Sequence, residues 1–338
     1  MNRTEKKFLE TVRRQELTQK GESVLVAVSG GPDSMALLHL FSAVAPVLQC
    51  RIGVAHCNFT LRGQESDGDE VYVKDVCRSL GFDCHSRLFD TRNVAAAWKK
   101  SIEETARILR YEFFDELRHE SGYNLIATGH HIGDNAETLL FNLFRGTAVS
   151  GLKGIRMRHG SVIRPLLPFS RKEIMDYLRD KEIAWRTDTT NLNIDYDRNF
   201  IRNKVIPLIE ERFRHKLMPA LQRISEHAGD LDEFIERHID RLVDQYTGLD
   251  LKAGQLHVET MLELTLFERK EILKRAFRMH GLTVDSRALE RVADLLGRQS
   301  GRSVPVGGGI MVVRRDGYLR FLPGEPSDEA PLDIPLLP

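Results

Sequence analysis

Apolar and polar residues follow one another along the first half of the chain in the order expected of an α/β fold. Short apolar runs predict buried strands, and the stretches between them carry apolar residues at helical spacing. The predicted strands are 24–28, 51–56, 83–88 and 124–128, and the predicted helices are 2–19, 65–80, 101–119 and 134–145. Strands that alternate with helices predict a parallel, doubly wound sheet with helices on both faces. Ligands bind such sheets beyond the carboxyl ends of the strands, so we expect the site there.

The second half of the chain has a different pattern, mainly helical and then β. Helical spacing predicts helices at 171–181, 216–246, 259–280 and 285–298. Short apolar runs follow, separated by three glycines and by Asp316-Gly317, a dipeptide that favours hairpins. The end of the chain is acidic and rich in proline, which predicts a loose tail. The predicted domains are 1–213 (catalytic), 214–300 (helical), 301–322 (a small β-hairpin module) and the tail 323–338.

Length and charge set limits on this picture. The chain has 338 residues, of which 41% are hydrophobic, enough for two or three domains. Lys+Arg and Asp+Glu both number 49, so a site for a polyanion must be a local basic patch. Basic residues are concentrated at 151–172 and 197–216. A solvated loop explains the first of these runs equally well.

Cysteine usage and hydropathy predict a cytoplasmic protein that does not enter a membrane. The four cysteines include no C-x-x-C pair, which disfavours a disulfide framework and a zinc site and predicts reduced thiols. No apolar stretch approaches the 18 or so residues of a membrane span, and the polar N-terminus does not resemble a signal peptide.

The most informative stretch is S-G-G-P-D-S at 29–34, between the apolar run 24–28 and a helical pattern. Adjacent glycines allow a tight turn of the backbone, and the start of the helix adds the positive end of its dipole, so the turn suits phosphate. The spacing is neither G-x-x-x-x-G-K-[ST] nor G-x-G-x-x-G. An ordinary strand-to-helix turn is the alternative interpretation. The stretch resembles the pyrophosphate loop of the N-type ATP pyrophosphatases, which split ATP between the α and β phosphates.

Four further stretches extend this resemblance to the family of tRNA(Ile)-lysidine synthases, densely over residues 22–207. The matching residues are His56, Asn58, Leu61 and Arg62; Ala106, Arg107, Arg110 and Tyr111; His130, His131, Asp134, Glu137 and Thr138; and Arg145-Gly146, Gly151 to Ile155, Arg164 to Leu167, Arg198, Asn199 and Arg202. Two stretches depart from the family pattern. Phe59 and Thr60 replace His-Gly, and Gly133 and Asn135 stand where Asp and Gln are usual.

The resemblance implies a ligase that forms a carbon–nitrogen bond. Such enzymes adenylate the wobble cytidine of a minor isoleucine tRNA with an unmodified CAU anticodon, and L-lysine then attacks carbon 2. AMP and pyrophosphate are released, and codon specificity changes from AUG to AUA. ATP and Mg²⁺ are the implied cofactors. The implied ATP-binding residues are Ser29, Gly30, Gly31, Pro32, Asp33, Ser34, His56 and Arg62, and the implied catalytic residues are Asp33 and Asp134.

The resemblance also implies a metal ligand, a lysine site and contacts to tRNA. Asp33 is the expected Mg²⁺ ligand, with capping of the following helix as the alternative. Asp134 and Glu137 lie on one helical face and, with Arg110, are the expected lysine-binding residues; without the resemblance they are a surface salt bridge. The expected tRNA-binding residues are Arg198, Arg202 and Lys204.

Two other functions compete with this interpretation. A tRNA thiolase on the same fold carries a C-x-x-C site, which this chain lacks. A tRNA-binding module that has lost catalysis is supported only by Gly133, and Asp33, Asp134 and Glu137 oppose it. The sequence leaves open whether the chain forms a homodimer.

Overall fold

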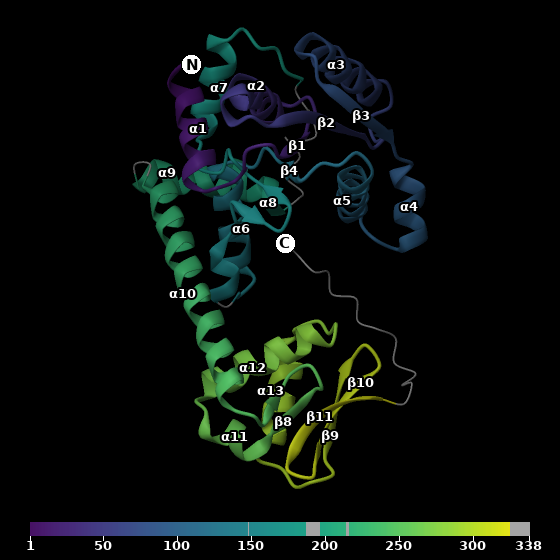
Figure 1. Ribbon diagram of the computed structural model, residues 1–338, viewed down its shortest axis with the longest axis vertical. Coiled ribbons are helices and arrows are strands. Elements are labelled where there is room, and N and C mark those ends of the chain that lie inside the picture. Colours follow the sequence, from purple (N-terminus) through teal and green to yellow (C-terminus); the bar gives the residue numbers. More distant parts are fainter. Residues whose placement is uncertain (148, 187–196, 214–215, 325–338) are drawn as a thin grey trace. The chain divides into compact units, whose positions relative to one another are not determined.

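The computed structural model describes residues 1–147, 149–186, 197–213 and 216–324. The chain separates into two compact units, Met1–Gly229 and Asp230–Pro338, which are described separately below (Figure 1). From residue 325 onward, the predicted tail lies outside the described residues. Among the described residues, no helix combines the length and the apolar character needed to cross a membrane.

The first unit is built on a six-stranded sheet with the order β3-β2-β1-β4-β6-β5 (Figure 1). All neighbouring strands are parallel except β5, which runs antiparallel to β6. The strands are β1 (Ser23–Ala27), β2 (Arg51–Asn58), β3 (Asp83–Leu88), β4 (Leu125–Ala127), β5 (Arg158–His159) and β6 (Val162–Ile163). The predicted parallel, doubly wound sheet is therefore confirmed.

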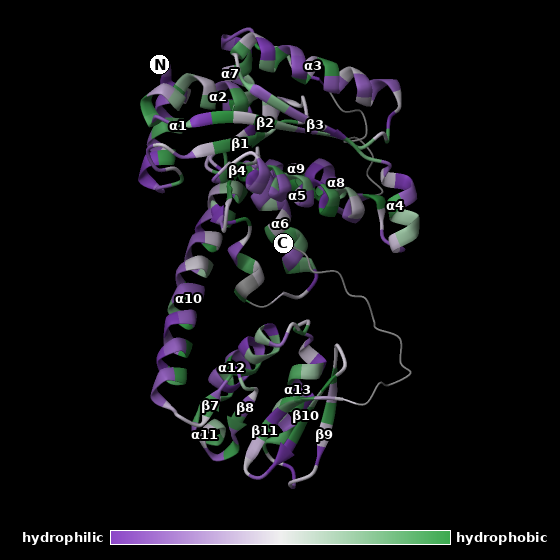
Figure 2. Ribbon diagram, turned by 45° about the vertical axis from the view of Figure 1, so that its right-hand side comes forward, coloured by the Kyte–Doolittle hydropathy of each residue, from purple (hydrophilic) through white to green (hydrophobic). Residues whose placement is uncertain are grey.

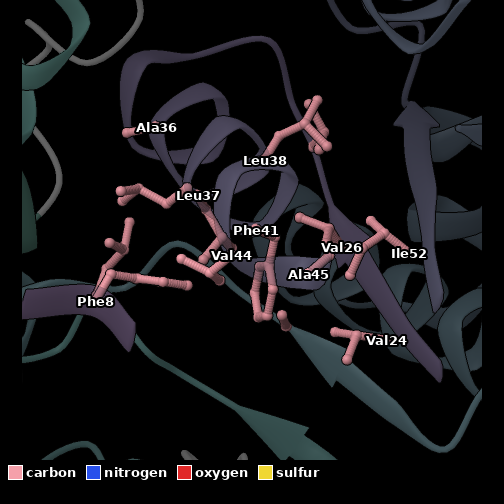
Figure 3. Packing of buried hydrophobic residues seen from close by; sticks show 14 of the residues in the cluster. Phe8, Val24, Val26, Ala36, Leu37, Leu38, Phe41, Val44, Ala45 and Ile52 are labelled. Atoms are coloured by element: carbon pink, nitrogen blue, oxygen red, sulfur yellow. The ribbon is translucent and has the colours of Figure 1, made fainter. Parts of the chain in front are cut away.

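Successive residues of β1 point to opposite faces of this sheet, and each face is covered by its own helices. Val24 and Val26 belong to a core that includes α1, α2, α3 and α7, whereas Leu25 packs with α5. Figure 3 shows the first core, where Phe41 of α2 lies near Phe8 of α1, their rings edge to face at 5.1 Å. These helices are α1 (Arg3–Arg14), α2 (Pro32–Leu48), α3 (Gln64–Leu80), α5 (Ile102–Glu120) and α7 (Arg171–Asp180); α4 (Thr91–Trp98) contacts α5.

A further cluster of helices packs beyond β4. Buried Leu139 and Leu140 of α6 pack with Ile201 and Ile206, which come from a short π-helix and the helix after it. The elements are α6 (Ile132–Phe144), the 3₁₀ helix η1 (Val149–Lys153), α8 (Asp197–Phe200), the π-helix η3 (Ile201–Val205), α9 (Ile206–Phe213) and α10 (Leu217–Gln245). The cluster brings residues of the second basic run to the beginning of α6.

The second unit combines the end of α10 and three further helices with a five-stranded antiparallel sheet of order β7-β8-β11-β10-β9. The helices are α11 (Val258–Glu263), α12 (Leu266–Met279) and α13 (Ser286–Leu295), and the strands are β7 (Leu249–Asp250), β8 (Gln255–His257), β9 (Ser303–Gly307), β10 (Ile310–Arg315) and β11 (Tyr318–Pro323). Phe277, Val292 and Leu319 belong to one core, so the predicted helical domain and hairpin module pack together. Figure 2 shows α10 as mainly hydrophilic, with scattered hydrophobic residues.

Candidate active site

The turn between β1 and α2, residues 29–34, leads directly into the N-terminus of α2 and is named the cradle. Gly30 has φ +90°, a conformation that side-chain-bearing residues rarely adopt. The Ser34 hydroxyl donates to the Gly31 carbonyl at 2.8 Å, while the Ser29 N–H donates to the Ser34 hydroxyl at 3.2 Å. The two serines therefore tie the turn to the first turn of α2. Backbone N–H groups at a helix N-terminus are a preferred site for phosphate.

The exit of β4 passes directly beside this turn. A Cβ added to Gly129 would lie 3.2 Å from the carbonyl carbon of Asp33 and 3.3 Å from the Ser34 nitrogen. Only a small residue allows this close approach. It brings the beginning of α6 next to Asp33.

Asp33 points away from the helix cap and makes tertiary contacts. Its carboxylate forms an ion pair with Arg171, the first residue of α7, and lies 3.9 Å from Nε2 of His131. The N-cap of α2 is Gly31, with no side-chain capping bond, so the alternative capping role of Asp33 is not observed. Sequence reasoning missed Arg171, although it lies in the basic run 151–172.

No described group of three or more His, Cys, Asp or Glu residues is placed to hold a metal ion. Mg²⁺ bound to nucleotides is held largely by phosphate oxygens and water, with one or two carboxylates from the protein. The single carboxylate of Asp33, beside the phosphate cradle and 31% exposed, fits such an ion.

The departure from the family pattern at Gly133 has a local structural reason. His131 is the N-cap of α6, and its Nδ1 accepts a hydrogen bond from the Gly133 N–H at 3.0 Å. A Cβ on residue 133 would lie only 2.6 Å from Cε1 of the His131 ring. Because Nδ1 is the acceptor, Nε2 carries the proton and faces Asp134 at 3.6 Å. Glycine at 133 therefore makes room for a histidine cap.

Asn135, the second departure in this stretch, connects α6 to its surroundings. Its Oδ1 accepts from the Ile155 N–H at 2.7 Å, and its Nδ2 donates to the Ser225 hydroxyl at 3.4 Å. Gly154, with φ +61°, is needed beside it, since an added Cβ would lie 2.1 Å from Oδ1 of Asn135. An amide at this position thus has a packing role.

Asp134 and Glu137 converge on one guanidinium, that of Arg202 in the π-helix η3. Arg202 donates from Nε to Glu137 Oε1 at 2.5 Å and from Nη2 to Glu137 Oε2 at 3.0 Å and Asp134 Oδ1 at 2.9 Å. Glu137 is only 6% exposed, and burial raises the pKa of its carboxyl although Arg202 opposes the shift. Hydrogen bonds between a guanidinium and a carboxylate are strongest when two parallel bonds form, as they do here between Arg202 and Glu137.

The side chains predicted to bind lysine and tRNA are not grouped as the sequence predicted, because Arg202, and not Arg110, contacts Asp134 and Glu137. Among the described residues, no ion pair joins Arg110 to Asp134 or Glu137, and the guanidinium of Arg110 lies 5.2 Å from the Phe59 ring centroid. Arg198 stacks on Phe141 at 5.8 Å. Lys204 is exposed on η3. The roles assigned to these side chains stay predictions.

His56, near the end of β2, is buried, and only one of its two ring nitrogens has a hydrogen-bond partner among the described residues. The Nδ1–H of His56 donates to the Val28 carbonyl at 2.8 Å. Its Nε2 is buried and has no partner among the described residues. Burial lowers the pKa of this imidazole, so near neutral pH Nε2 is a free acceptor beside the cradle.

Arg62 is linked to the cradle through two residues that sequence reasoning missed. Its guanidinium bonds Oδ2 of buried Asp69 at 2.7 Å, and Arg186 bonds Oδ1 of the same carboxylate at 2.8 Å. The Arg186 backbone N–H donates to the Gly30 carbonyl at 2.9 Å. Asp69 and Arg186 thus connect Arg62 to the backbone of Gly30.

Phe59 and Thr60, the other departure from the family pattern, have packing partners of their own. Phe59 stacks on Phe89 with ring centroids 5.5 Å apart, and its ring lies beneath Arg110. Thr60, at φ 52°, donates its hydroxyl to the Phe89 carbonyl at 2.7 Å.

The sequence of this chain is similar to a known family of domains and to known proteins over nearly its whole length. The family model of the PP-loop domain matches residues 1–209. The chain is 65% identical to the tRNA(Ile)-lysidine synthase of Chlorobaculum tepidum over 97% of this chain and 99% of that relative. It is 34% identical to the tRNA(Ile)-lysidine synthase of Bacteroides thetaiotaomicron over 98% of this chain and 75% of the relative.

A solved structure with a similar fold is the U34-tRNA thiolase NcsA from Methanococcus maripaludis with its 4Fe-4S cluster. The match has a TM-score of 0.55 and 18% identity, and covers 68% of this chain and 78% of that one. At this identity the likeness concerns the fold alone.

His130 gives a prediction for the dependence of stability on pH. Burial, opposed by Asp134 and reinforced by the nearby arginines, lowers its pKa to about 4 from 6.5. The unfolded chain therefore binds a proton between those values that the folded chain excludes, and stability falls as pH decreases from 6.5 to 4. Between pH 6.5 and 4 the free energy of unfolding of His130→Gln should therefore decrease by up to about 3 kcal/mol less than that of the wild type.

The measurement is urea unfolding from pH 7 to 4, followed by tryptophan fluorescence. Both tryptophans, Trp98 and Trp185, belong to the first unit and report on it alone. His159→Gln, at an exposed position on β5, is the matched control. An identical pH profile for wild type and His130→Gln would contradict the assignment.

Proposed function

The chain belongs to the tRNA(Ile)-lysidine synthase family, and from this premise we propose that it ligates L-lysine to the wobble cytidine of an isoleucine tRNA. The tRNA carries an unmodified CAU anticodon, ATP is consumed, AMP and pyrophosphate are released, and codon specificity changes from AUG to AUA. The observation that carries the proposal is the convergence of Asp134 and Glu137 beside a phosphate cradle. The reaction needs a nucleotide site and a cation site at one edge, and the position of His131 between Asp33 and Asp134 supports this assignment.

In the first step, oxygen 2 of the cytidine attacks the α-phosphorus of ATP. An oxygen–phosphorus bond forms, the bond between the α-phosphorus and the bridging oxygen breaks, and pyrophosphate leaves with its electrons. The N–H groups of the turn at 29–34 hold the leaving group, and Arg171 lies close enough to Asp33 to add a positive charge. Asp33 would hold Mg²⁺, which when bound would neutralise part of the negative charge on the leaving pyrophosphate.

In the second step, an amino group of lysine attacks carbon 2 of the adenylated cytidine. A carbon–nitrogen bond forms, the bond from carbon 2 to oxygen breaks, AMP leaves with the oxygen, and the nitrogen loses its extra protons. Lysine carries an ammonium that costs several kcal/mol to desolvate without a carboxylate partner. We assign this partner to Asp134 and Glu137, whose present cation, Arg202, the substrate must replace.

The rival reaction, tRNA thiolation, finds little support in the cysteines. Burial raises the pKa of the Cys57 thiol to about 12, so it is a poor nucleophile. Cys77 and Cys84 lie in the core on the α2 face of the sheet, where Cys77 is buried. A cytoplasmic location and the possibility of a homodimer stay predictions from the sequence.

The proposed activity is tested by incubating the protein with ATP, lysine and the unmodified isoleucine tRNA. Mass analysis of the wobble nucleoside should then show a gain of one lysine minus water. The control is the same transcript with uridine at the wobble position, which should stay unmodified. A gain corresponding to sulfur for oxygen would establish a thiolase instead, and binding without any mass change would identify a non-catalytic tRNA-binding protein.

Two charge-removing variants separate the amino acid site from the nucleotide site. Glu137→Gln keeps the shape but removes a charge, so the KM for lysine should rise roughly tenfold, equivalent to about 1.4 kcal/mol, at nearly constant KM for ATP. Asp33→Asn should abolish tRNA-dependent pyrophosphate release at nearly unchanged tRNA affinity. Each variant is the control for the other. A raised KM for ATP in Glu137→Gln, at unchanged KM for lysine, would move the acidic pair to the nucleotide site.

A further inference from the structure

Three arginines gather around Tyr111 and His130 at the carboxyl edge of the sheet. Arg107 and Arg110 come from the first half of α5, and Arg164 directly follows β6. We call these three residues the arginine cluster. The guanidinium of Arg107 lies 5.2 Å from the Tyr111 ring centroid. Burial lowers the pKa of Arg164, an effect that Tyr111 opposes, and the positive charges of all three guanidiniums help to lower the pKa of His130.

Arg107 and Arg110 of the arginine cluster are half-buried, and Glu103 acts on Arg110 without forming an ion pair with it. In the part of the chain that the structure describes, none of the three forms an ion pair with a carboxylate; Arg107 and Arg110 lie instead against the rings of Tyr111 and Phe59. Asp134, the acidic group acting on His130, is already bonded to Arg202. Like charges gathered away from water repel one another, and the aromatic contacts offset only part of that cost.

Arg164 gives the second observation that indicates a ligand. The side chain is buried, with 8% of the residue exposed, and its Nη1 donates to the Arg156 carbonyl at 2.8 Å. Its Nε–H, however, has no partner among the described residues. An unsatisfied buried donor of a charged group is costly, so it is expected where a ligand completes the hydrogen bonding.

The surroundings indicate which anion fits. The leaving pyrophosphate does not need the arginine cluster, because it is proposed to bind at the turn 29–34 after β1. Lysine brings one carboxylate with two ammonium groups, so a site of three uncompensated cations repels the molecule as a whole. A phosphodiester carries a negative charge without any cation, and a nucleotide that enters a reaction pocket needs its backbone held in register.

We propose that the arginine cluster binds a phosphodiester group of the tRNA next to the reacting cytidine. The inference rests on the proposed function for the identity of the RNA, and it replaces the role in lysine binding that the sequence predicted for Arg110. Arg107 and Arg164 thereby become positioning residues for the nucleotide, in addition to the basic run 197–216.

The test uses the full chain and a full-length isoleucine tRNA ligated from synthetic pieces. One version is unmodified, and others carry a single uncharged methylphosphonate on either side of the wobble cytidine or in the acceptor stem. Dissociation constants are measured over a range of salt concentrations without ATP or lysine, so that the readout is independent of catalysis. The variants are Arg107→Gln, Arg107→Lys and, as a control at an exposed position on α4, Arg92→Gln.

Arg107→Gln should weaken tRNA binding roughly tenfold and reduce the slope of log affinity against log salt by about one contact, whereas Arg107→Lys should retain most of the slope. A methylphosphonate beside the cytidine should weaken binding of the wild type but have little further effect in Arg107→Gln. The acceptor-stem methylphosphonate should affect both proteins equally, and Arg92→Gln should match the wild type.

Three results would overturn the inference. In the first, Arg107→Gln and each methylphosphonate next to the cytidine weaken binding additively. In the other two, the salt slope of Arg107→Gln is unchanged while either its KM for lysine rises or its binding of ATP weakens. The last two would assign the arginine cluster to the amino acid or to the nucleotide. The expected coupling between Arg107→Gln and a methylphosphonate can be observed even if the wild type yields no lysine adduct. In that case the phosphate site stands and the proposed function fails.

Discussion

The contact of Arg202 with Asp134 and Glu137 is the constraint on which the account of this site depends. Two carboxylates on one helical face, one of them buried, require a cation, and the chain supplies it from a π-helical turn. A π-helical turn is uncommon and is found disproportionately at functional sites. Because a buried charge cannot be left unpaired, the proposed binding of lysine to this acidic pair requires exchange with the guanidinium. Under this proposal, the exchange selects a substrate that carries a second ammonium group.

Much of the catalytic unit was predictable from local sequence patterns. The order of strands and helices follows from periodicity, and the turn at 29–34 follows from a short motif, since both depend on neighbouring residues. The acidic pair at 134 and 137 was singled out by the resemblance to the family. The partners of these groups could not be predicted in this way: Arg171 is 138 residues from Asp33, and Arg202 is 65 residues from Glu137. Such pairs form only through the tertiary fold. Short elements such as β5 to β8 also escaped prediction, because two or three residues carry no periodic signal.

The departures from the family pattern have local explanations once neighbours are known. Gly133 leaves space for the ring of His131, and Asn135 bonds the backbone at Ile155. Phe59 provides an aromatic surface beneath Arg110, a member of the arginine cluster. Each departure thus concerns packing or capping around the site, while Asp33, Asp134 and Glu137 keep their charges. The loss of an acid at 133 is therefore no argument for loss of catalysis.

The most direct test of the exchange at Asp134 and Glu137 is the stabilisation of the protein by L-lysine in Arg202→Met, followed by tryptophan fluorescence on heating. Methionine removes the cation and retains an apolar side chain, so the two carboxylates are left without their partner and lysine can restore the charge balance. The account predicts that lysine raises the unfolding temperature of Arg202→Met more than that of the wild type, while Arg179→Met, at an exposed position on α7, behaves as the wild type. No lysine-dependent stabilisation of Arg202→Met, or the same rise in both proteins, would contradict it.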